Sequence, residues 1–313
     1  MTVLPKTLRL GTRASLLART QSGHVADALS RALGRDVELV DVTTEGDVSS
    51  APLASFGGVG VFVSAVRDAL VRGEVDLAVH SLKDLPTAEH PDVVIAAVPL
   101  REDPRDVVVA RDGLTLGELP AGSRIGTGSP RRAAQLHALG LGFDVVGIRG
   151  NVDTRIRKVA EGEVDAVVLA RAGVARLGRL DEVTEVLDPL QMLPAPGQGA
   201  LAVECRRTDA DLVRAVAEAI DDVRTRAAVT VERAVLASLE AGCSAPVGAL
   251  AEVAEGDHGD ELWVRAVALS HDGAIAVRRS ATGGTDEAAE LGRRLGQEML
   301  DDGASTLIEE RAS

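Results

Sequence analysis

The stretches RLGTRAS (9–15) and RIGTGSP (124–130) are similar to each other, and each joins a predicted strand to a predicted helix. A second similar pair follows in the same order, with RGEVDLAVHS (72–81) matched by EGEVDAVVLA (161–170). Chance similarity between common α/β segments is the alternative explanation, but the kept order favours duplication. The repeats therefore predict two related α/β domains, of which the first carries an insertion.

Apolar runs alternate with segments of helix length around these repeats. Strands are predicted at 8–12, 37–44, 76–81 and 93–100, and helices at 15–33 and 61–73. Near-continuous apolar strands separated by helices are typical of parallel sheets with helices on both faces. The pattern therefore predicts an α/β fold with two doubly wound domains.

The extra length of the first copy falls at residues 45–62, a stretch rich in Gly, Ser and Ala that we interpret as a mobile lid loop. Residues 100–106 and 193–200 have the composition of linkers. The second linker leads to a predicted strand at 200–207, which would return the chain to the first domain. The expected result is two lobes joined by two crossings, with a cleft between them.

From residue 221 the pattern changes to a long helix at 225–240, three alternating strands and a final helix that starts near Asp286. Alternation indicates a sheet with one covered face, and hence a small α+β domain. The predicted domains are residues 1–99 with 200–220, residues 105–193, and residues 221–313.

Composition excludes several classes of protein. The 313 residues carry a formal net charge of −14 and only 1% are aromatic, which argues against binding phosphates and stacking on bases. Two cysteines, Cys205 and Cys243, cannot build a disulfide framework or a cysteine-rich zinc site. No apolar run approaches the ~20 residues of a membrane span, and the first ten residues lack the apolar core of a signal peptide. We expect a soluble, cytoplasmic protein.

Positive charge is carried almost entirely by arginine. Residues 124–179 hold nine arginines and one lysine against five acidic residues. Because arginine binds carboxylates through two parallel hydrogen bonds, this density in an acidic protein predicts a pocket for a small molecule that bears carboxylates. Solvated helix faces are the alternative for some of them, namely Arg157, Arg171 and Arg179.

Several of these arginines fall at turns between a strand and a helix. Ser129 is predicted as an N-cap with Pro130 at the first helical position, which puts Arg131 and Arg132 in the first turn. That turn already exposes N–H groups and the positive end of the helix dipole, so the pair indicates anion binding more than stability. Equivalent turns carry Arg149, Arg155, Arg13 and Ser15. Ligands of open α/β folds bind beyond the carboxyl ends of strands, so these turns are expected to converge.

The stretch AVHSLKDLP (78–86) ends an apolar strand with Ser81, Lys83 and Asp84. A surface ion pair, worth ~0–1 kcal/mol, is one interpretation. At a strand end that faces a cleft, the Asp84 carboxylate can instead move protons or stabilise a cationic intermediate.

The two cysteines differ in their setting. Cys205 lies in a predicted strand, where a small buried cysteine is usual. Cys243 lies in AGCSAPVG, a loop of small residues and proline that suits an accessible, reactive thiol. Spacing alone leaves a reactive and an ordinary Cys243 equally open. No His, Cys, Asp or Glu cluster has metal-ligand spacing, so no metal is expected.

Seven motifs together resemble the hydroxymethylbilane synthase family, also called porphobilinogen deaminases: GTRASLLA, AVHSLKDLP, REDPRD, GTGSPRR, RGNVDTR, PGQGALAVECR and AGCSAPVGA. They occur in the family's order and cover nearly the whole chain. The resemblance implies a transferase of tetrapyrrole (porphyrin and heme) biosynthesis. Such an enzyme joins four porphobilinogens head to tail with release of ammonia, and then hydrolyses off linear hydroxymethylbilane. The implied fold has three domains, the first two similar to periplasmic binding proteins.

The resemblance also assigns roles to residues. It implies a dipyrromethane cofactor held by a thioether to Cys243, and it implies Asp84 as the catalytic carboxylate. Cofactor contacts are implied for Ser15, Ser81, Lys83, Asp84, Ser129, Arg131 and Arg132. Substrate contacts are implied for Arg13, Arg149, Arg155 and Arg176.

Three positions depart from the family's usual pattern. Ser55 and Val59 in the lid stand where many members carry lysine, and Ala241 stands where Gly-Gly-Cys is usual. The lid is therefore expected to contribute less charge here.

A second class of function stays open, a bilobal protein that binds a small carboxylate anion without catalysis. Such a protein has no use for a modified Cys243. Because no exposed apolar repeat demands a partner, we expect a monomer.

Overall fold

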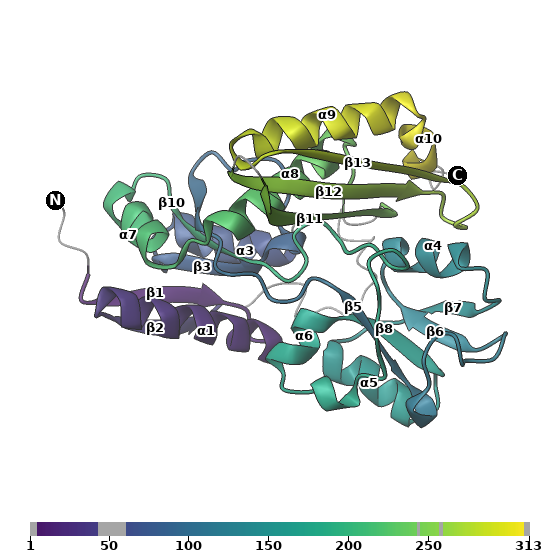
Figure 1. Ribbon diagram of the computed structural model, residues 1–313. Coiled ribbons are helices and arrows are strands. Elements are labelled where there is room, and N and C mark those ends of the chain that lie inside the picture. The colour runs from purple at the N-terminus through teal and green to yellow at the C-terminus, as the bar shows by residue number, and fades with distance from the viewer. Residues whose placement is uncertain (1–4, 43–60, 243–244, 257–258, 310–313) are drawn as a thin grey trace. The chain divides into compact units, whose positions relative to one another are not determined.

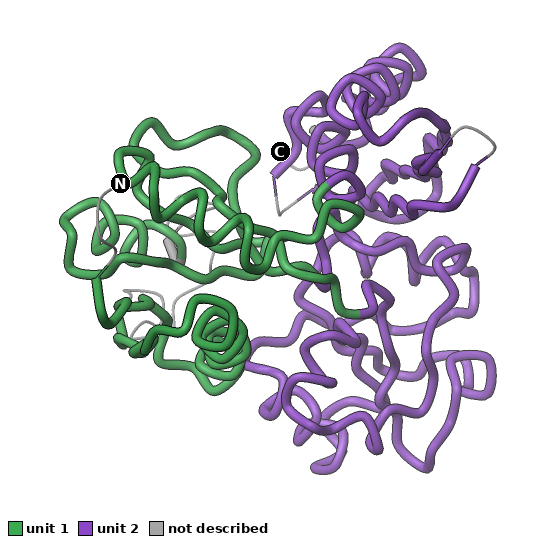
Figure 2. Tube along the Cα trace, turned by 60° about the vertical axis from the view of Figure 1, so that its left-hand side comes forward, with its two compact units in different colours: residues 1–102, 200–226 green, residues 103–199, 227–313 purple. Residues whose placement is uncertain are grey.

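The computed structural model describes residues 5–42, 61–242, 245–256 and 259–309 (Figure 1). The chain divides into two compact units, each built from two stretches (Figure 2). Unit 1 is residues 1–102 with 200–226, and unit 2 is residues 103–199 with 227–313. The boundaries at 102/103 and 199/200 fall inside the segments predicted as linkers, 100–106 and 193–200. The division into three domains stays a prediction. Across the described ranges, no helix combines the length and apolar character that crossing a membrane requires.

The described part of unit 1 contains a five-stranded sheet. Its strands, in spatial order, are β2 (Asp36–Asp41), β1 (Thr7–Thr12), β3 (Leu77–Ser81), β10 (Leu201–Arg206) and β4 (Val93–Ala97). Strand β1 pairs in parallel with β2 and β3, whereas β10 is antiparallel to both β3 and β4. The predicted return of the chain at 200–207 is therefore confirmed.

The described part of unit 2 contains a second five-stranded sheet with the same topology. Its strands, in spatial order, are β7 (Asp144–Gly147), β6 (Arg124–Thr127), β8 (Ala166–Ala170), β5 (Asp106–Ala110) and β9 (Glu185–Val186). Strand β6 is parallel to β7 and β8, and β5 is antiparallel to β8 and β9. The matching orders confirm the predicted internal repeat.

The prediction of parallel sheets was wrong for one strand in each. Strands β10 and β5 do not follow a covering helix of their own sheet but enter it directly from a crossing of the chain. A strand that arrives in this way needs no helical crossover, so it can run antiparallel to its neighbours. The α/β class and the doubly wound pattern remain correct.

Helices cover both faces of each sheet, as predicted. In unit 1, α1 (Leu16–Leu33) and α7 (Ala210–Ile220) pack on one face, and α3 (Val61–Val71) packs on the other. In unit 2, α4 (Pro130–Ala138) covers one face, and α5 (Val152–Ala160) with α6 (Arg171–Arg176) covers the other. Each core is aliphatic, so the sheets are stabilised mainly by burial of apolar surface.

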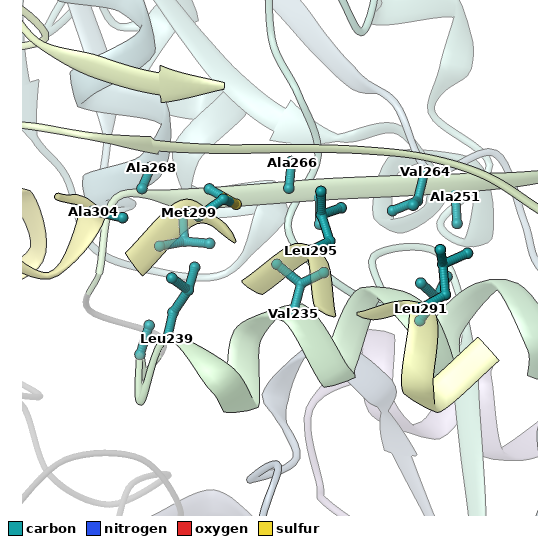
Figure 3. Close-up of a cluster of buried hydrophobic side chains, with 14 of the residues drawn as sticks. Val235, Leu239, Ala251, Val264, Ala266, Ala268, Leu291, Leu295, Met299 and Ala304 are labelled. Atoms are coloured by element: carbon teal, nitrogen blue, oxygen red, sulfur yellow. The ribbon is translucent and has the colours of Figure 1, made fainter. Parts of the chain in front are cut away.

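The C-terminal part of unit 2 is an antiparallel sheet with helices on it, and the first of these helices, α8, begins within the last residues of unit 1. The elements are β11 (Val247–Gly256), β12 (Gly259–Leu269), β13 (Ala276–Gly284), α8 (Val223–Ser238), α9 (Ala288–Asp301) and α10 (Ala304–Glu309). Figure 3 shows side chains of α8 and α9 directed at alternate residues of β12, which confirms the α+β prediction. The two helices approach closely, because a Cβ at Gly292 would lie 2.5 Å from the carbonyl oxygen of Val231.

The prediction that only one face of this sheet is covered was wrong. Part of the opposite face is also buried. Leu250, Val267 and Leu269 are buried against Ala134 of α4 and against Leu193. The alternation of polar and apolar residues in β12 stops at this point, because Val267, Ala268 and Leu269 are all apolar. A strand buried on both faces loses its alternation.

A buried ion network joins α3 to the sheet of unit 1. Arg67 donates two hydrogen bonds to the Glu204 carboxylate, at 2.9 and 2.6 Å, and Nε2 of His80 lies 3.3 Å from the same carboxylate. Burial alone would raise the pKa of Glu204, but His80 and Arg67 lower it to about 2. The network therefore contributes stability only while Glu204 is ionised.

We expect the variant Glu204→Gln to lose stability in a pH-dependent way. Because the folded pKa of Glu204 lies below the ordinary value of 4.5, its contribution is complete above that pH and is lost as the pH falls toward 2. The loss at neutral pH should be about 3–5 kcal/mol, since Arg67 is left as a buried, unpaired charge. Urea unfolding at pH 7 and at pH 3 measures the difference from wild type. A difference that stays constant between these pH values would contradict this assignment.

Candidate functional site

The carboxyl edge of the unit 1 sheet carries two turns with predicted site residues. Arg13 and Ser15 follow β1, and the Ser15 hydroxyl accepts a 3.4 Å hydrogen bond from the Ala18 N–H as the N-cap of α1. Gln21 of the same helix donates to the Ser81 hydroxyl at 3.1 Å. Since β1 and β3 are parallel neighbours, this contact ties the end of β3 to the start of α1. The structure thus brings these predicted residues to one edge, as expected.

Asp84 is displayed on a short, well-anchored turn. The 3-10 turn Leu82–Asp84 follows β3, and the Leu82 N–H donates to the carbonyl oxygen of Ala200 at 3.0 Å. Leu82 and Leu85 are buried on either side, while Asp84 itself is exposed and Lys83 is half-buried. A fixed backbone with an exposed carboxylate suits a group that must meet a ligand.

In unit 2, Arg131 and Arg132 are buried at the start of α4. Arg131 donates to Oδ2 of Asp106 at 2.8 Å and to the carbonyl oxygen of Leu193 at 2.6 Å. Arg132 donates to Oδ1 of Asp106 at 2.7 and 3.2 Å and to the carbonyl oxygen of Val168 at 3.0 Å. The arginine pair therefore has a structural role, contrary to the prediction that it serves anion binding more than stability. One anion that the pair binds is the protein's own Asp106.

Asp106 stays charged in this setting. Burial alone would raise the pKa of Asp106, but the positive charges of Arg131 and Arg132 outweigh burial and hold it well below the usual range. The three groups together carry one net positive charge. Nε of Arg131 is buried and has no hydrogen-bond partner among the described residues. A buried donor of this kind is costly to leave unpaired, so the cluster retains unused capacity for an acceptor.

Arg149 and Arg155 lie at the next turn of unit 2. Arg155 donates to the carbonyl oxygen of Gly150 at 2.9 Å, and within the described ranges no carboxylate pairs with either arginine. Burial, followed by the charges of Arg132 and Arg149, lowers the pKa of Arg155. Positive charges crowded in this way favour a bound anion.

Glycine at position 128 leaves room beside this group. A Cβ at Gly128 would lie 2.9 Å from the carbonyl oxygen of Ile148 and 3.8 Å from a terminal nitrogen of Arg155. Ser129 is the N-cap of α4, with Pro130 at the first helical position as predicted, although its hydroxyl makes no capping hydrogen bond. Arg176, at the end of α6, donates to the carbonyl oxygen of Gly199 at 2.7 Å.

The arginines interpreted as ordinary helix-surface residues have local acidic partners. Arg157 pairs with Glu161 at 3.5 Å on the exposed face of α5. Arg171 lies 3.4 Å from Asp103, and Arg179 binds Glu182 and Asp153. These pairs agree with a structural role.

Of the two cysteines, Cys205 lies among the described residues. Cys205 is fully buried in β10, and burial raises the pKa of its thiol to about 12. A thiol with that pKa is unreactive at neutral pH. Cys243 lies outside the described residues, as do the lid positions Ser55 and Val59. The described residues form no cluster of three or more potential metal ligands.

Sequence reasoning missed two residues of this arrangement, Asp106 and Gln198. Asp106 ends the motif REDPRD and Gln198 lies within PGQG, so both stand in segments interpreted only as linkers. Gln198 donates to Oδ1 of Asp106 at 2.8 Å. The sequence shows Asp106 as a single acidic residue at the start of an apolar run. One acidic residue in that place does not by itself indicate an arginine partner.

Comparison with known proteins gives a consistent result along the chain. Residues 8–214 match the family described as porphobilinogen deaminase, dipyromethane cofactor binding domain, and residues 226–301 match the porphobilinogen deaminase C-terminal domain. The chain belongs to the porphobilinogen deaminase family.

Two relatives illustrate the extent of this similarity. Porphobilinogen deaminase of Nocardia farcinica is 60% identical over 311 residues, which covers 98% of this chain and 89% of the relative. Porphobilinogen deaminase 1 of Streptomyces coelicolor is 60% identical over 316 residues, which covers 98% of this chain and 99% of the relative. The family relationship therefore extends over both sheets of the repeat and over the C-terminal part.

Solved structures match more distantly. The methionine binding protein MetQ aligns with 68% of this chain and 89% of its own, at 14% identity and a TM-score of 0.43. A double mutant of the VFT2 domain of Bordetella pertussis BvgS aligns with 68% of this chain and 86% of its own, at 19% identity and a TM-score of 0.44. TM-scores this low do not by themselves establish a shared fold.

The residues of this porphobilinogen deaminase family member fit the cofactor that names the larger domain. A dipyrromethane carries acetate and propionate groups, so its site needs several cationic donors. The described part of unit 2 contains groups of this kind: Nε of Arg131 has no partner there, and positive charges crowd around Arg155. Unit 1 has polar groups of its own, Ser81, Lys83 and Asp84, at the carboxyl edge of its sheet.

Proposed function

We propose that this chain joins four porphobilinogen molecules head to tail on a covalently bound dipyrromethane primer, with loss of one ammonia at each step. Hydrolysis then releases linear hydroxymethylbilane. The observation that carries the proposal is the family match over both the cofactor-binding domain and the C-terminal domain. Incubation with porphobilinogen, followed by measurement of ammonia and hydroxymethylbilane, tests it. Failure to release either product would contradict it.

We assign the cofactor attachment to Cys243. Cys205, the other cysteine, is buried in a strand with a thiol pKa raised to about 12, which leaves it unsuited to attachment. The bound dipyrromethane supplies a pyrrole ring with a free α-carbon, to which the first substrate is joined. A covalent tether keeps this growing chain end beside one catalytic group and avoids repeated bimolecular encounters.

Asp84 is assigned to the chemical step. Loss of the protonated amine from porphobilinogen leaves an electron-poor pyrrole with positive charge. A carboxylate hydrogen-bonded to the pyrrole N–H groups stabilises that charge, and a carboxylate can also take the proton whose loss restores aromaticity. The exposed side chain on an anchored turn supports this role.

The cationic and hydroxyl side chains are assigned to the acidic groups of primer and substrate. Each added pyrrole brings two further carboxylates, so negative charge accumulates as the chain grows. Cofactor contacts are proposed for Ser15, Ser81, Lys83, Ser129, Arg131 and Arg132, and substrate contacts for Arg13, Arg149, Arg155 and Arg176. Charge-assisted, bidentate hydrogen bonds explain why arginine and not lysine is used.

The variant Arg149→Lys is expected to slow elongation by about tenfold, because lysine keeps the charge but loses the two-pronged hydrogen-bonding geometry. The rate of each addition is measured by mass spectrometry of enzyme-bound intermediates after mixing with porphobilinogen. Arg157→Lys is the matched control, since Arg157 pairs only with Glu161 on an exposed helix face. Equal intermediate distributions in Arg149→Lys and wild type would remove Arg149 from carboxylate binding.

The alternative of a non-catalytic anion-binding protein gains no specific support from the described residues. The expectations of a cytoplasmic monomer that binds no nucleic acid stay predictions.

A further inference from the structure

Asp106 organises a buried network that the proposed chemistry does not use directly. It is the first residue of β5 and is 0% exposed. Its two carboxylate oxygens accept hydrogen bonds from Arg131, Arg132 and Gln198. Both arginines come from the first turn of α4, so one carboxylate fixes the direction of two guanidinium groups.

Gln198 extends this network to the second crossing of the chain. Its amide donates to Oδ1 of Asp106 at 2.8 Å and to the carbonyl oxygen of Pro104 at 2.7 Å. Pro104 and Asp106 lie just after the unit boundary at 102/103, and Gln198 lies just before the boundary at 199/200. The network therefore bonds together the two segments of unit 2 that lead to and from unit 1.

Leu193 and Pro194, which precede Gln198 in the chain, are hydrogen-bonded to both α4 and β11. The carbonyl oxygen of Leu193 accepts from Arg131 at 2.6 Å and from Gln135 at 3.0 Å. The next carbonyl oxygen, of Pro194, accepts from the Ala249 N–H of β11 at 3.0 Å. Movement of the arginine pair would thus disturb both crossings and an edge strand of the C-terminal sheet.

We propose that Asp106 is a positioning residue for the reaction: it holds Arg131 and Arg132 in the one orientation in which their remaining donors meet the acidic groups of the cofactor. The inference rests on the proposed function. The unpaired Nε of Arg131 supports it, because this buried donor has no partner while Nη1 is held by Leu193 and Nη2 by Asp106.

Charge and geometry make opposite predictions for the variant Asp106→Asn. Removal of the carboxylate leaves two uncompensated positive charges, which by charge alone should speed the capture of an acidic pyrrole. The amide keeps only one acceptor oxygen and sets an NH2 donor against the other guanidinium, so at least one arginine turns away, which should slow capture. A misplacement of about 1 Å is enough to cost on the order of 100-fold in rate.

The test follows the gain in mass of apoprotein, obtained from cells that make no porphobilinogen, after porphobilinogen is added. We expect Asp106→Asn to gain mass about 10- to 100-fold more slowly than wild type. Asp165→Asn is the matched control, because Asp165 also binds an arginine of unit 2, Arg111 at 2.8 Å, away from the arginine pair. It should gain mass at the wild-type rate even if its melting temperature falls.

Gln198→Ala provides a milder variant in case Asp106→Asn does not fold. It keeps both arginine bonds to Asp106 and removes the Gln198 link between the crossings, so a slowing of about threefold to tenfold is expected. Rates equal to or faster than wild type in folded Asp106→Asn, or in Gln198→Ala when the first variant is unfolded, would overturn the inference. If wild type itself gains no mass, the proposed function fails instead.

Discussion

Replacement of Asp84 by asparagine is expected to lower porphobilinogen turnover by about 10²- to 10⁴-fold, the usual contribution of a positioned acid or base. The amide keeps the size of the side chain but can neither take a proton nor balance positive charge on a pyrrole. Stability should not change, because the Asp84 side chain is exposed and the turn is held by buried Leu82 and Leu85. Ammonia release at saturating porphobilinogen measures the effect.

Asp36→Asn is the matched control for this prediction. Asp36 is an exposed carboxylate at the amino end of β2, so it lies on the opposite edge of the same sheet. Its variant should turn over at the wild-type rate, and both variants should unfold at the wild-type urea concentration. A turnover rate in Asp84→Asn within a few-fold of wild type would remove Asp84 from the chemical step.

Replacement of Cys243 by serine is expected to abolish both the cofactor mass and turnover. Serine keeps the size of the side chain, but an alcohol is a far weaker nucleophile than a thiolate at neutral pH, so no stable thioether can form. Intact-mass spectrometry should give the mass of the bare sequence, whereas wild type should be heavier by one dipyrromethane.

Cys205→Ala provides the control, since it removes the other thiol. Cys205 is fully buried, so its variant should lose some stability through a small cavity but keep the mass increment. An increment that survives in Cys243→Ser and disappears in Cys205→Ala would reverse the assignment.

The presence of two related α/β domains could be predicted from the repeat, because strand-to-helix turns such as RLGTRAS and RIGTGSP mark equivalent positions in both copies. Ser15 and Ser129 were correctly predicted as helix starts from local residue preferences. The antiparallel direction of β5 and β10 could not be predicted, because an apolar run carries no mark of its direction within a sheet.

The candidate site could be predicted only where a motif displays its own chemistry. Asp84 follows a buried strand, and local sequence is enough to place it at the sheet edge. The partnership of Asp106 with Arg131 and Arg132 joins residues about 25 positions apart on different elements, and it depends on how β5 enters the sheet. The opposed charges were visible in the sequence, but their contact was not.

The mass of the wild-type protein, and the peptide on which any added mass lies, decide whether Cys243 carries the cofactor. We expect a protein heavier than its sequence by one dipyrromethane, with the addition on the proteolytic peptide that contains Cys243. Brief exposure to porphobilinogen should then add further pyrrole units one at a time to that same peptide. An active protein with the unmodified mass, or one modified only on the peptide that contains Cys205, would contradict it.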